Sequence, residues 1–525
     1  MRFWVSHSCF LLYLGMFIRR KPNKSGTFSV QVVSKFRGTY KLEKSFGASS
    51  DEEVLKELEH QANDWISRYA GQLEINFASS EDVDKHYSNI DNVLNSIDKV
   101  LLNGPFLILE RIYDSIGFNQ IDDKMLRDLA IARVCEPMSK LATVSYLKTR
   151  CNKDVLLHDV YRYMDKLYNT QQALVQKISV EHTKTILGGE IGIVFYDVTT
   201  LYFETAREDV LRTPGFSKDG KTTESQVVLG LLVSKHGYPL SYSLFNGSQF
   251  EGRTMLPIVD DFVQRFNLTD FVVVSDAGLM TRKNISLLKS AGYKFILGGR
   301  IKKEADKVKE WLFSLEKRNG AVYDCILDSD ERIIASYSEK RASKDSYNRQ
   351  KGIERLEKSY KSGKVNKKNI NQRGYNKFLR VENDVLVTID YEKIKEDEQW
   401  DGWKSYITNT DLPPSDVIDL YKGLWVVERA FRVSKGTLEM RPMFHFTERR
   451  IESHVCICFV AYKLYKELER VISELGINMS VDTVIDIAKT IPTIEIPLPN
   501  GQILRRTIFN TQLQLAIKPL FPPEI

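Results

Sequence analysis

The sequence predicts an α/β fold, and the main evidence is two short apolar runs that each end on an aspartate. Residues 191–196 and 271–275 are rich in β-branched and aromatic side chains, and Asp197 and Asp276 follow them directly. Runs of this kind are typical of strands that are buried on both faces of a sheet. Open α/β sheets bind ligands outside the carboxyl ends of such strands, so both aspartates are candidate site residues.

The stretch between the two aspartates predicts the order of the sheet. Strands are expected at 227–234 and 240–245, joined by the turn residues His236 and Gly237, and a helix is expected at 255–266. A meander followed by a helix and a parallel strand resembles the ribonuclease H-like arrangement. We therefore expect a core of this kind.

Two different regions are expected before this core. Residues 27–33 alternate like a strand, residues 38–42 are a candidate partner strand, and acidic residues open a helix expected from Asp51 to about Ala70. Residues 85–190 are expected to be helical throughout, with leucine, isoleucine and valine side chains forming their core. The sequence thus predicts a small α+β domain and then a helical region.

Residues 300–400 interrupt the core with short strand-like runs and one basic segment. Strands are expected at 322–327, 332–336 and 384–389, which predicts a mostly β insertion. From Arg341 to Arg380 there are 13 Lys or Arg residues and 3 Asp or Glu residues. Such an excess suits a polyanion, whereas a solvated loop is the alternative explanation.

The segment 421–435 is expected to form one helix with an unusual polar stripe. Tyr421, Glu428 and Lys435 recur every seven residues, close to two turns, so they share one side of that helix. Arg432, four residues after Glu428, borders the same side. A carboxylate between a phenol and two cations indicates an acid that binds a metal beside groups that bind phosphate.

Asp197, Asp276 and Glu428 together match what two Mg²⁺ ions require. Hard cations take oxygen ligands, and two ions about 3.5–4 Å apart clamp the attacking and leaving oxygens of a phosphodiester. Each acid alone has an ordinary explanation, since strand-end aspartates often form turns and Glu428 can pair with Arg432 on a helix surface. The combination favours the metal site.

These residues resemble the DDE-type insertion-sequence transposases, in the group with a Tyr-x2-Arg-x3-Glu-x6-Lys signature (insertion sequence family four and relatives). Tyr421, Glu428 and Lys435 keep the signature spacing, but Leu424 occupies the Arg position. Lys422 or Arg432 is a candidate replacement for that cation.

Four further pieces resemble the family in the same order along the chain. Tyr196-Asp197-Val-Thr-Thr and Ser275-Asp276-Ala-Gly-Leu resemble the contexts of its first and second catalytic aspartates. Asp401-Gly402-Trp403 precedes the glutamate segment, and Arg441-Pro442-Met-Phe-His445 follows it, as in the family. The resemblance runs from about residue 16 to at least residue 465.

The resemblance implies a DNA transposase that cuts insertion-sequence ends and joins them to target DNA by two-metal phosphoryl transfer. It implies two Mg²⁺ ions, with Mn²⁺ as a substitute. The implied partners are double-stranded DNA, as terminal inverted repeats and target, and a second copy of the chain in a synaptic homodimer, with no membrane partner. The expected catalytic and metal-binding residues are Asp197, Asp276 and Glu428, and the expected phosphate-binding residues are Tyr421, Lys435 and Arg432.

Two other functions remain open at this point. A ribonuclease H-like nuclease would cut without strand transfer, and an inactive relic of a mobile element would only bind DNA. In the helical region, basic and aromatic residues fit an approach to the transposon ends or an ordinary helix surface: Lys140, Tyr146, Lys148, Arg150, Tyr161 and Arg162.

A length of 525 residues predicts two to four domains, and the formal net charge is +6. The expected parts are an N-terminal extension (1–15), the small α+β domain (16–80), the helical DNA-binding region (81–190), the catalytic core (191–299 and 400–475), the insertion (300–399) and a C-terminal region (476–525). A signal peptide is the alternative explanation of residues 1–15.

The six cysteines show no CxxC spacing. Cys456 and Cys458 lie in an apolar helical stretch and are expected to be core residues, as are Trp403 and Trp425. Free buried thiols suit a reducing compartment. With the family resemblance, this predicts a cytoplasmic, nucleoid-associated protein of a prokaryote.

Overall fold

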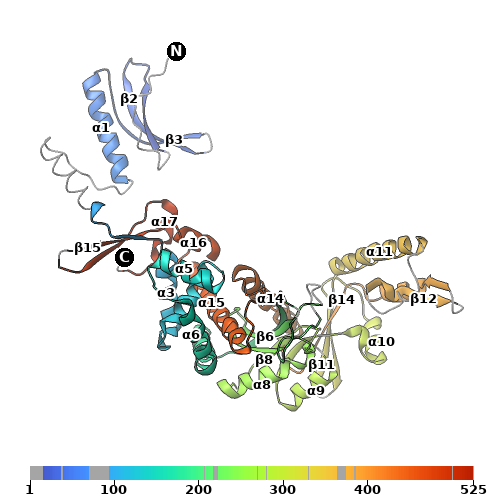
Figure 1. Cartoon of the computed structure of the whole chain (residues 1–525). Helices are drawn as coiled ribbons and strands as arrows, with labels where there is room; N and C mark the ends of the chain where they lie inside the picture. Colours follow the sequence, from blue (N-terminus) through green and yellow to red (C-terminus); the bar gives the residue numbers. More distant parts are fainter. Residues whose placement is uncertain are drawn as a thin grey trace. The chain divides into compact units, whose positions relative to one another are not determined.

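The computed structural model divides the chain into two compact units, Met1–Ile97 and Asp98–Ile525 (Figure 1). The expected extension, residues 1–15, lies outside the described residues. The structure describes residues 16–36, 39–69, 94–205, 207–216, 223–268, 270–279, 281–328, 330–362, 374–382, 386–498 and 500–523.

The first unit is a three-stranded antiparallel sheet with one helix packed on it. Its strands β1 (Met16–Pro22), β2 (Phe28–Phe36) and β3 (Thr39–Ser49) lie in the order β1-β2-β3, and α1 (Glu52–Tyr69) follows. Val30 and Val32 of the sheet are fully buried against α1. The expected strands and helix of this region are confirmed.

The second unit opens with the predicted helical region. A short strand, β4 (Lys99–Leu101), precedes five helices with polar caps or a left-handed glycine at several ends. Apolar residues of all five helices share one core, which continues into the large sheet of this unit. The helices are α3 (Gly104–Ile116), α4 (Lys124–Cys135), α5 (Lys140–Cys151), α6 (Leu157–Thr170) and α7 (Gln172–Ile186).

The core is an eight-stranded sheet in the order β10-β11-β14-β9-β8-β5-β6-β7. Strands β5, β6 and β7 form an antiparallel meander, and β8 and β9 continue it in parallel with β5, which is the predicted ribonuclease H-like topology. Helix α8 (Met255–Phe266) lies between β7 and β8, and α9 (Arg282–Ser290) between β8 and β9. The five strands are β5 (Ile193–Tyr202), β6 (Gln226–Ser234), β7 (Pro239–Asn246), β8 (Val272–Ser275) and β9 (Lys294–Gly298).

The prediction of a mostly β insertion is wrong. Strands β10 (Val322–Asp328) and β11 (Glu331–Tyr337) extend the core sheet, because β11 pairs with β14 (Trp403–Thr408) and β14 pairs with β9. An edge strand gains backbone partners in this way. What remains beyond the sheet is mainly helical: α11 (Glu339–Lys361) and α12 (Tyr391–Glu398), with a hairpin of β12 (Leu379–Glu382) and β13 (Leu386–Ile389).

Helix α11 is tied to the sheet by a bidentate ion pair. The guanidinium of Arg349 donates to both carboxylate oxygens of Asp401 at 2.5 and 2.6 Å, just before β14. Asp401 belongs to one of the motifs that resembled the family. In this structure it joins α11 to the sheet.

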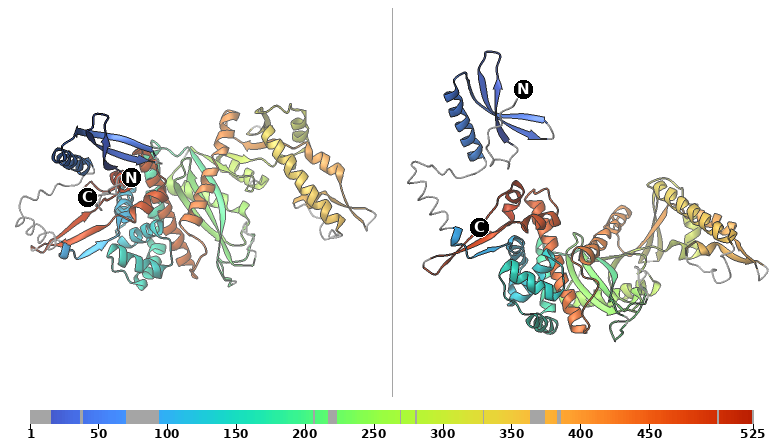
Figure 2. Two further views of the ribbon diagram at one scale, coloured as in Figure 1. Left: turned by 90° about the horizontal axis from the view of Figure 1, so that it is seen from above. Right: turned by 45° about the horizontal axis from the view of Figure 1, so that its top comes forward.

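The C-terminal part supplies the helices that cover one face of the sheet. Helices α13 (Pro414–Lys422) and α14 (Trp425–Arg432) come first, and the long helix α15 (Glu448–Glu474) agrees with the predicted helix at about 448–475. Figure 2 shows α15 between the helical region and the sheet. The chain ends with α16 (Val481–Ala488), β15 (Thr493–Pro497), β16 (Ile503–Thr507) and α17 (Gln512–Ile517), and β15 pairs with β4.

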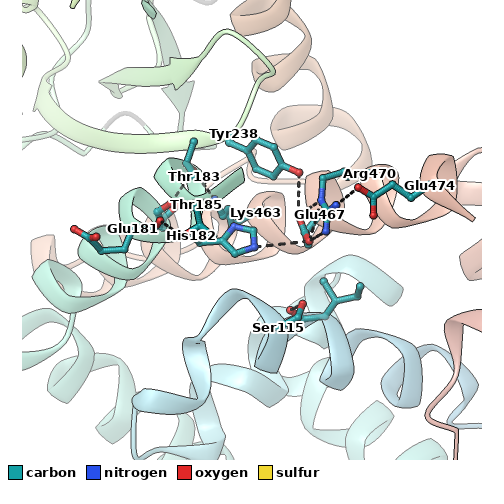
Figure 3. Close-up of polar contacts among 12 residues, drawn as sticks. Ser115, Glu181, His182, Thr183, Thr185, Tyr238, Lys463, Glu467, Arg470 and Glu474 are labelled. Carbon is teal, nitrogen blue, oxygen red and sulfur yellow. Dashed lines mark hydrogen bonds and ion pairs between the residues drawn. The ribbon is translucent and has the colours of Figure 1, made fainter. Parts of the chain in front are cut away.

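Helix α15 is fixed by a buried polar cluster around Glu467, which is 1% exposed (Figure 3). The hydroxyl of Tyr238 donates to Glu467 at 2.9 Å, and Arg470 donates at 2.6 Å. Burial would raise the pKa of Glu467, but hydrogen bonds from His182, Arg470 and Tyr238 outweigh it and lower the pKa to about 2. Nearby, Lys463 of α15 donates to Ser179 and Thr183 of α7.

Candidate active site

The two strand aspartates occupy matched positions on neighbouring parallel strands. In the register of β5 and β8, Tyr196 is opposite Ser275, so Asp197 and Asp276 are the next residue on each strand. Neighbouring strands lie about 4.8 Å apart. The structure thus brings these two acids side by side, although one is in mid-sequence of β5 and the other follows the last residue of β8.

The predicted strand that ended at Tyr196 is too short. Strand β5 continues to Tyr202, because residues 199–202 still pair with β6 on their other side. Asp197 therefore does not lie at the end of its own strand. It lies where the neighbouring strand β8 stops, which opens the backbone beside it.

Asp276 is held by a tight turn. Its Oδ1 accepts the backbone N–H groups of Gly278 at 2.9 Å and Leu279 at 3.1 Å. From the other side, Arg300 donates to the carbonyls of Ala277 at 2.6 Å and Gly278 at 2.7 Å. These four bonds fix the direction of the carboxylate. Arg300 was not predicted from the sequence, although it comes shortly after the end of β9 as Asp276 comes after the end of β8.

Both acids face the side of the sheet that α13 and α14 cover. Phe195 and Val274, two residues before the respective acids, share a core with Val427 and Phe431 of α14. Side chains two apart on a strand point to the same face. The structure therefore places Asp197 and Asp276 beneath the segment that carries Glu428.

The prediction of one continuous helix over 421–435 is wrong. Helix α13 ends at Lys422, α14 begins at Trp425, and a π-helical turn occupies Val433–Thr437. The break lies at Gly423, where an added Cβ would come within 2.6 Å of Phe195 Cζ and 2.9 Å of the Leu420 carbonyl oxygen. The chain thus approaches β5 too closely for a side chain, and the seven-residue spacing spans three helical pieces.

Tyr421 lies against the turn that follows Asp276. Its hydroxyl is hydrogen-bonded to the backbone of Ala277 and packs against Gly298. Burial, followed by the charge of Asp276 and more weakly that of Glu428, raises the pKa of Tyr421 to about 12. The Lys404 ammonium lies 4.4 Å from the centre of the Tyr421 ring. Tyr421 thus connects α13 to the Asp276 turn.

A hollow of about 360 Å³ joins the remaining predicted residues. It is lined by Glu428, Arg432, Lys435 and Arg441, together with Phe431 and Gly436. Three cations around one carboxylate favour an anionic ligand. Lys435 also reaches the sheet, because its Nζ donates to Thr199 Oγ1 of β5 at 2.8 Å. Thr199 is two residues after Asp197, on the same face of β5.

The three acids do not form a closed ligand set. Within the described parts of the chain, no group of three or more His, Cys, Asp or Glu side chains is arranged to hold a metal ion. The pair Asp197 and Asp276 fits a hard cation, since adjacent carboxylates supply the oxygen ligands that Mg²⁺ prefers. Glu428 is exposed in the hollow.

Residues 188–464, just over half of the chain, match the family described as the transposase DDE domain. The chain belongs to the DDE transposase domain family. The matched range covers the meander, both strand aspartates, the insertion and the glutamate segment. Membership makes this an enzyme of the class that cleaves DNA and transfers its strands.

Solved transposase structures resemble this DDE transposase only distantly. The piggyBac transposase synaptic complex with hairpin DNA is 9% identical, with a TM-score of 0.37 over 74% of this chain and 78% of that one. The Mos1 paired-end complex with left transposon end is 10% identical (TM-score 0.15; 33% and 58% covered), and the Mos1 complex with Mn is 13% identical (0.14; 35% and 65%). A search of curated proteins gave no match.

The DDE transposase departs from the signature at Leu424, which is 7% exposed and packs in the main core. Of the two candidate replacement cations, Lys422 pairs with Asp419 at 2.8 Å, whereas Arg432 lines the hollow beside Glu428. Arg441, which was predicted only as part of a motif, also lines the hollow and lies 5.5 Å from the centre of the Tyr202 ring.

The structure contradicts the predictions for Trp425 and Lys140 and confirms those for Trp403, Cys456 and Cys458. Trp425 is 55% exposed and is not a core residue, whereas Trp403 is buried. Lys140 is 5% exposed, so it does not offer its charge to DNA from the surface. Cys456 and Cys458 are buried free thiols, as predicted. Among the described helices, none is long and apolar enough to cross a membrane.

Proposed function

We propose that this protein is a DNA transposase that cuts insertion-sequence ends and joins them to target DNA by two-metal phosphoryl transfer. The observation that supports this most is the in-register pair Asp197 and Asp276 beneath a cationic hollow that contains Glu428. Carboxylates beside clustered cations suit a reaction at a phosphodiester. Family membership supports the same class of reaction.

In this proposal Asp197, Asp276 and Glu428 would hold two Mg²⁺ ions, for which Mn²⁺ would substitute. When bound, the ions activate the attacking oxygen and stabilise the leaving oxygen. Arg300 and Tyr421 keep the Asp276 turn in place for this role.

The cations of the hollow are proposed to hold the DNA backbone. Lys435, Arg432 and Arg441 bind phosphates near the scissile bond, and the Lys435 bond to Thr199 orients its ammonium over β5. Tyr421 is proposed to act mainly through the Asp276 turn, because its hydroxyl is already bonded there. No covalent protein–DNA intermediate is needed.

We assign the chain to the Tyr-Arg-Glu-Lys signature group on the spacing of Tyr421, Glu428 and Lys435. Arg432 takes over from the missing signature Arg, because it shares the hollow with Glu428 while Leu424 is buried. The proposed substrates are terminal inverted repeats and target DNA, bound by a homodimer that holds two ends together. The proposed setting is the nucleoid in a prokaryotic cytoplasm.

The test is a Mg²⁺-dependent strand-transfer assay on duplexes that carry candidate terminal inverted repeats. We expect Asp276→Asn to lower cutting and joining by about a hundredfold or more, because a lost metal ligand removes several kcal/mol of transition-state stabilisation. Binding to the ends should remain. Asp270→Asn, an exposed aspartate just before β8, is the matched control and should cut normally.

The outcomes separate the three functions. Cutting without joining supports a nuclease, and end binding without metal-dependent cutting supports an inactive relic. Cutting that survives Asp276→Asn shows that the carboxylates are wrongly assigned.

A further inference from the structure

The N-terminal unit leaves one face of its sheet uncovered by its own helix. Alternate residues of β1 point to opposite faces, and Arg20 bonds to Glu52 and Glu59 of α1, so Phe17, Arg19 and Lys21 point away from α1. The same face continues on the other two strands. Val33, Gln31 and Ser29 of β2 pair with Phe17, Arg19 and Lys21 of β1, and they pair on their other side with Leu42, Ser45 and Ala48 of β3. We call this the open face.

Charge is segregated along the sequence of this unit, between the strand segment and the helix segment. Residues 16–49, which form the strands, contain eight Lys or Arg and one Glu, whereas residues 50–69, which contain α1, have six Asp or Glu and two Lys or Arg. The net charges are therefore 8 − 1 = +7 and 2 − 6 = −4. On the helix side the acids pair with Arg20. The open face keeps Arg19, Lys21 and Lys35, and this favours a polyanion.

The centre of the open face holds a pair of side chains suited to base edges. Arg19 and Gln31 are directly opposite each other, and Arg19 donates to Gln31 Oε1 through Nε at 3.3 Å and Nη2 at 3.2 Å. This contact orients both groups and leaves the other N–H donors of the guanidinium and the amide for a ligand. Arginine pairs with guanine O6 and N7, and glutamine with adenine N6 and N7.

Apolar side chains flank this polar pair. Phe17, Tyr40 and Leu42 are 41%, 53% and 50% exposed, and the Phe17 and Tyr40 rings form an edge-to-face pair with centroids 5.9 Å apart. Lys35 lies over the Tyr40 ring at 5.2 Å. Apolar contact with the thymine methyl group is one way in which the major groove is read.

The size of the open face matches a groove of duplex DNA. Two spacings of about 4.8 Å separate the outer strands, so the face is roughly 10 Å across. The major groove is about 12 Å wide and accepts β-strands. We propose that the open face of β1-β2-β3 is a second DNA-binding surface, which reads base edges in the major groove of double-stranded DNA through Arg19 and Gln31.

The electrostatic part is tested in the full chain with Asp276→Asn added, so that binding is measured without cutting. We expect Lys21→Ala/Lys35→Ala to weaken duplex binding and to reduce the slope of log K against log salt by about 2, one contact for each lysine. Lys56→Ala removes an exposed lysine from α1 and is the matched control; it should leave the slope unchanged.

The base-reading part is tested by selecting bound sequences from random duplexes. We expect Arg19→Ala and Gln31→Ala each to lower the ratio of affinities for selected and random duplexes by about tenfold. This is near the low end of the discrimination that one good side-chain–base pair provides. Gln61→Ala, on exposed α1, should keep the preference.

A third measurement uses the unsubstituted surface. Duplex DNA should protect Lys21 and Lys35 from a lysine-acetylating reagent while Lys56 reacts as before. Unprotected lysines, or a Lys21→Ala/Lys35→Ala slope equal to that of Lys56→Ala, would overturn the proposal. Equal competition by RNA or single-stranded DNA would also overturn it. The proposal rests on the proposed function for its DNA ligand. These measurements compare binding among open-face variants, whereas the strand-transfer assay tests the catalytic assignment, so the two can fail separately.

Discussion

At the scale of single residues, the Asp276 turn shows how a carboxylate is aimed before any ligand arrives. Its two backbone N–H bonds orient one oxygen, and Arg300 holds the same turn by two successive carbonyls. Hydrogen bonds made by a charged donor contribute about 1.5–3 kcal/mol. The position of this acid therefore depends on a cation that does not itself need to touch DNA.

We expect Arg300→Ala to lower Mg²⁺-dependent cutting by roughly tenfold to a hundredfold, because a shift of about 1 Å in a catalytic group has effects of that size. The free energy of unfolding should fall by roughly 1–3 kcal/mol. Lys303→Ala, an exposed cation three residues later, is the control and should change neither. Wild-type rates for Arg300→Ala would mean that the turn holds its shape alone.

The sequence predicts a residue of this kind only when a local pattern points to it. Asp276 was predictable because an apolar strand ends on it, and Glu428 because of its spacing. Arg300 acts on a turn 23 residues earlier in the chain, and no local pattern records that contact. Arg441 reaches the hollow for the same reason, through the packing of its segment on β5.

At the scale of elements, the break at Gly423 decides where Glu428 lies. Helix α13 ends before the break, and α14 begins after it as a separate helix that packs on β5. Glycine is needed there for space and not for a left-handed backbone, because its φ is −61°. A seven-residue spacing describes one helix only if the helix is continuous, and the contact with Phe195 could not be read from the sequence.

We expect Gly423→Ala to push α14 away from β5, because the new methyl would overlap Phe195 Cζ and the Leu420 carbonyl oxygen. Overpacking of this kind costs roughly 1–3 kcal/mol, and cutting should fall with it. Gly192→Ala, just before β5 and with nothing within 4 Å of the added carbon, is the control. Adding Phe195→Leu should restore part of the activity, and a failure to restore any would place the obstruction at the carbonyl oxygen.

In the insertion, the positions of two strands were predictable from the sequence but their pairing was not. Its strand patterns were recognisable, and β10 and β11 lie where strands were expected. Their partner was not recognisable, because pairing of β11 with β14 joins residues about 70 positions apart. The basic segment was expected to be loop or polyanion-binding surface, and the part of it that the structure describes is largely the helix α11.

At the scale of the whole second unit, a buried lysine joins the helical region to α15. Lys140 of α5 has its Nζ 3.3 Å from His454 Nδ1, and His454 Nε2 lies 3.8 Å from the Cys458 sulfur. Arg133 and His445 complete the surroundings. Burial, followed by the charge of Arg133, lowers the pKa of Lys140 to about 7.

This pKa makes stability depend on pH in a defined direction. The unfolded lysine, with a pKa near 10.4, binds more protons than the folded one between about pH 7 and 10, so stability should rise with pH in that window. We expect Lys140→Met to be more stable by roughly 1–4 kcal/mol at pH 7, because it removes a buried unpaired charge. Its gain over wild type should shrink by pH 9, as measured by denaturant unfolding.

The control for this prediction is Lys148→Met, an exposed lysine on the same helix. It should alter stability by less than about 0.5 kcal/mol at both pH values. The stability difference between Lys140→Met and wild type could instead be the same at pH 7 and pH 9. That result would contradict the prediction, because it would mean that Lys140 does not lose a proton on folding in this pH range.

The long interval between the second aspartate and the glutamate has a consequence for synthesis of the protein. The ribosome adds 152 residues between Asp276 and Glu428, which takes roughly 8–30 s at 5–20 residues per second. Throughout that time the nascent chain already contains Asp197 and Asp276, but it does not yet contain helix α14, which carries Glu428. In the proposed mechanism, which needs all three acids, a growing chain therefore cannot cut DNA until Glu428 has been added, late in translation.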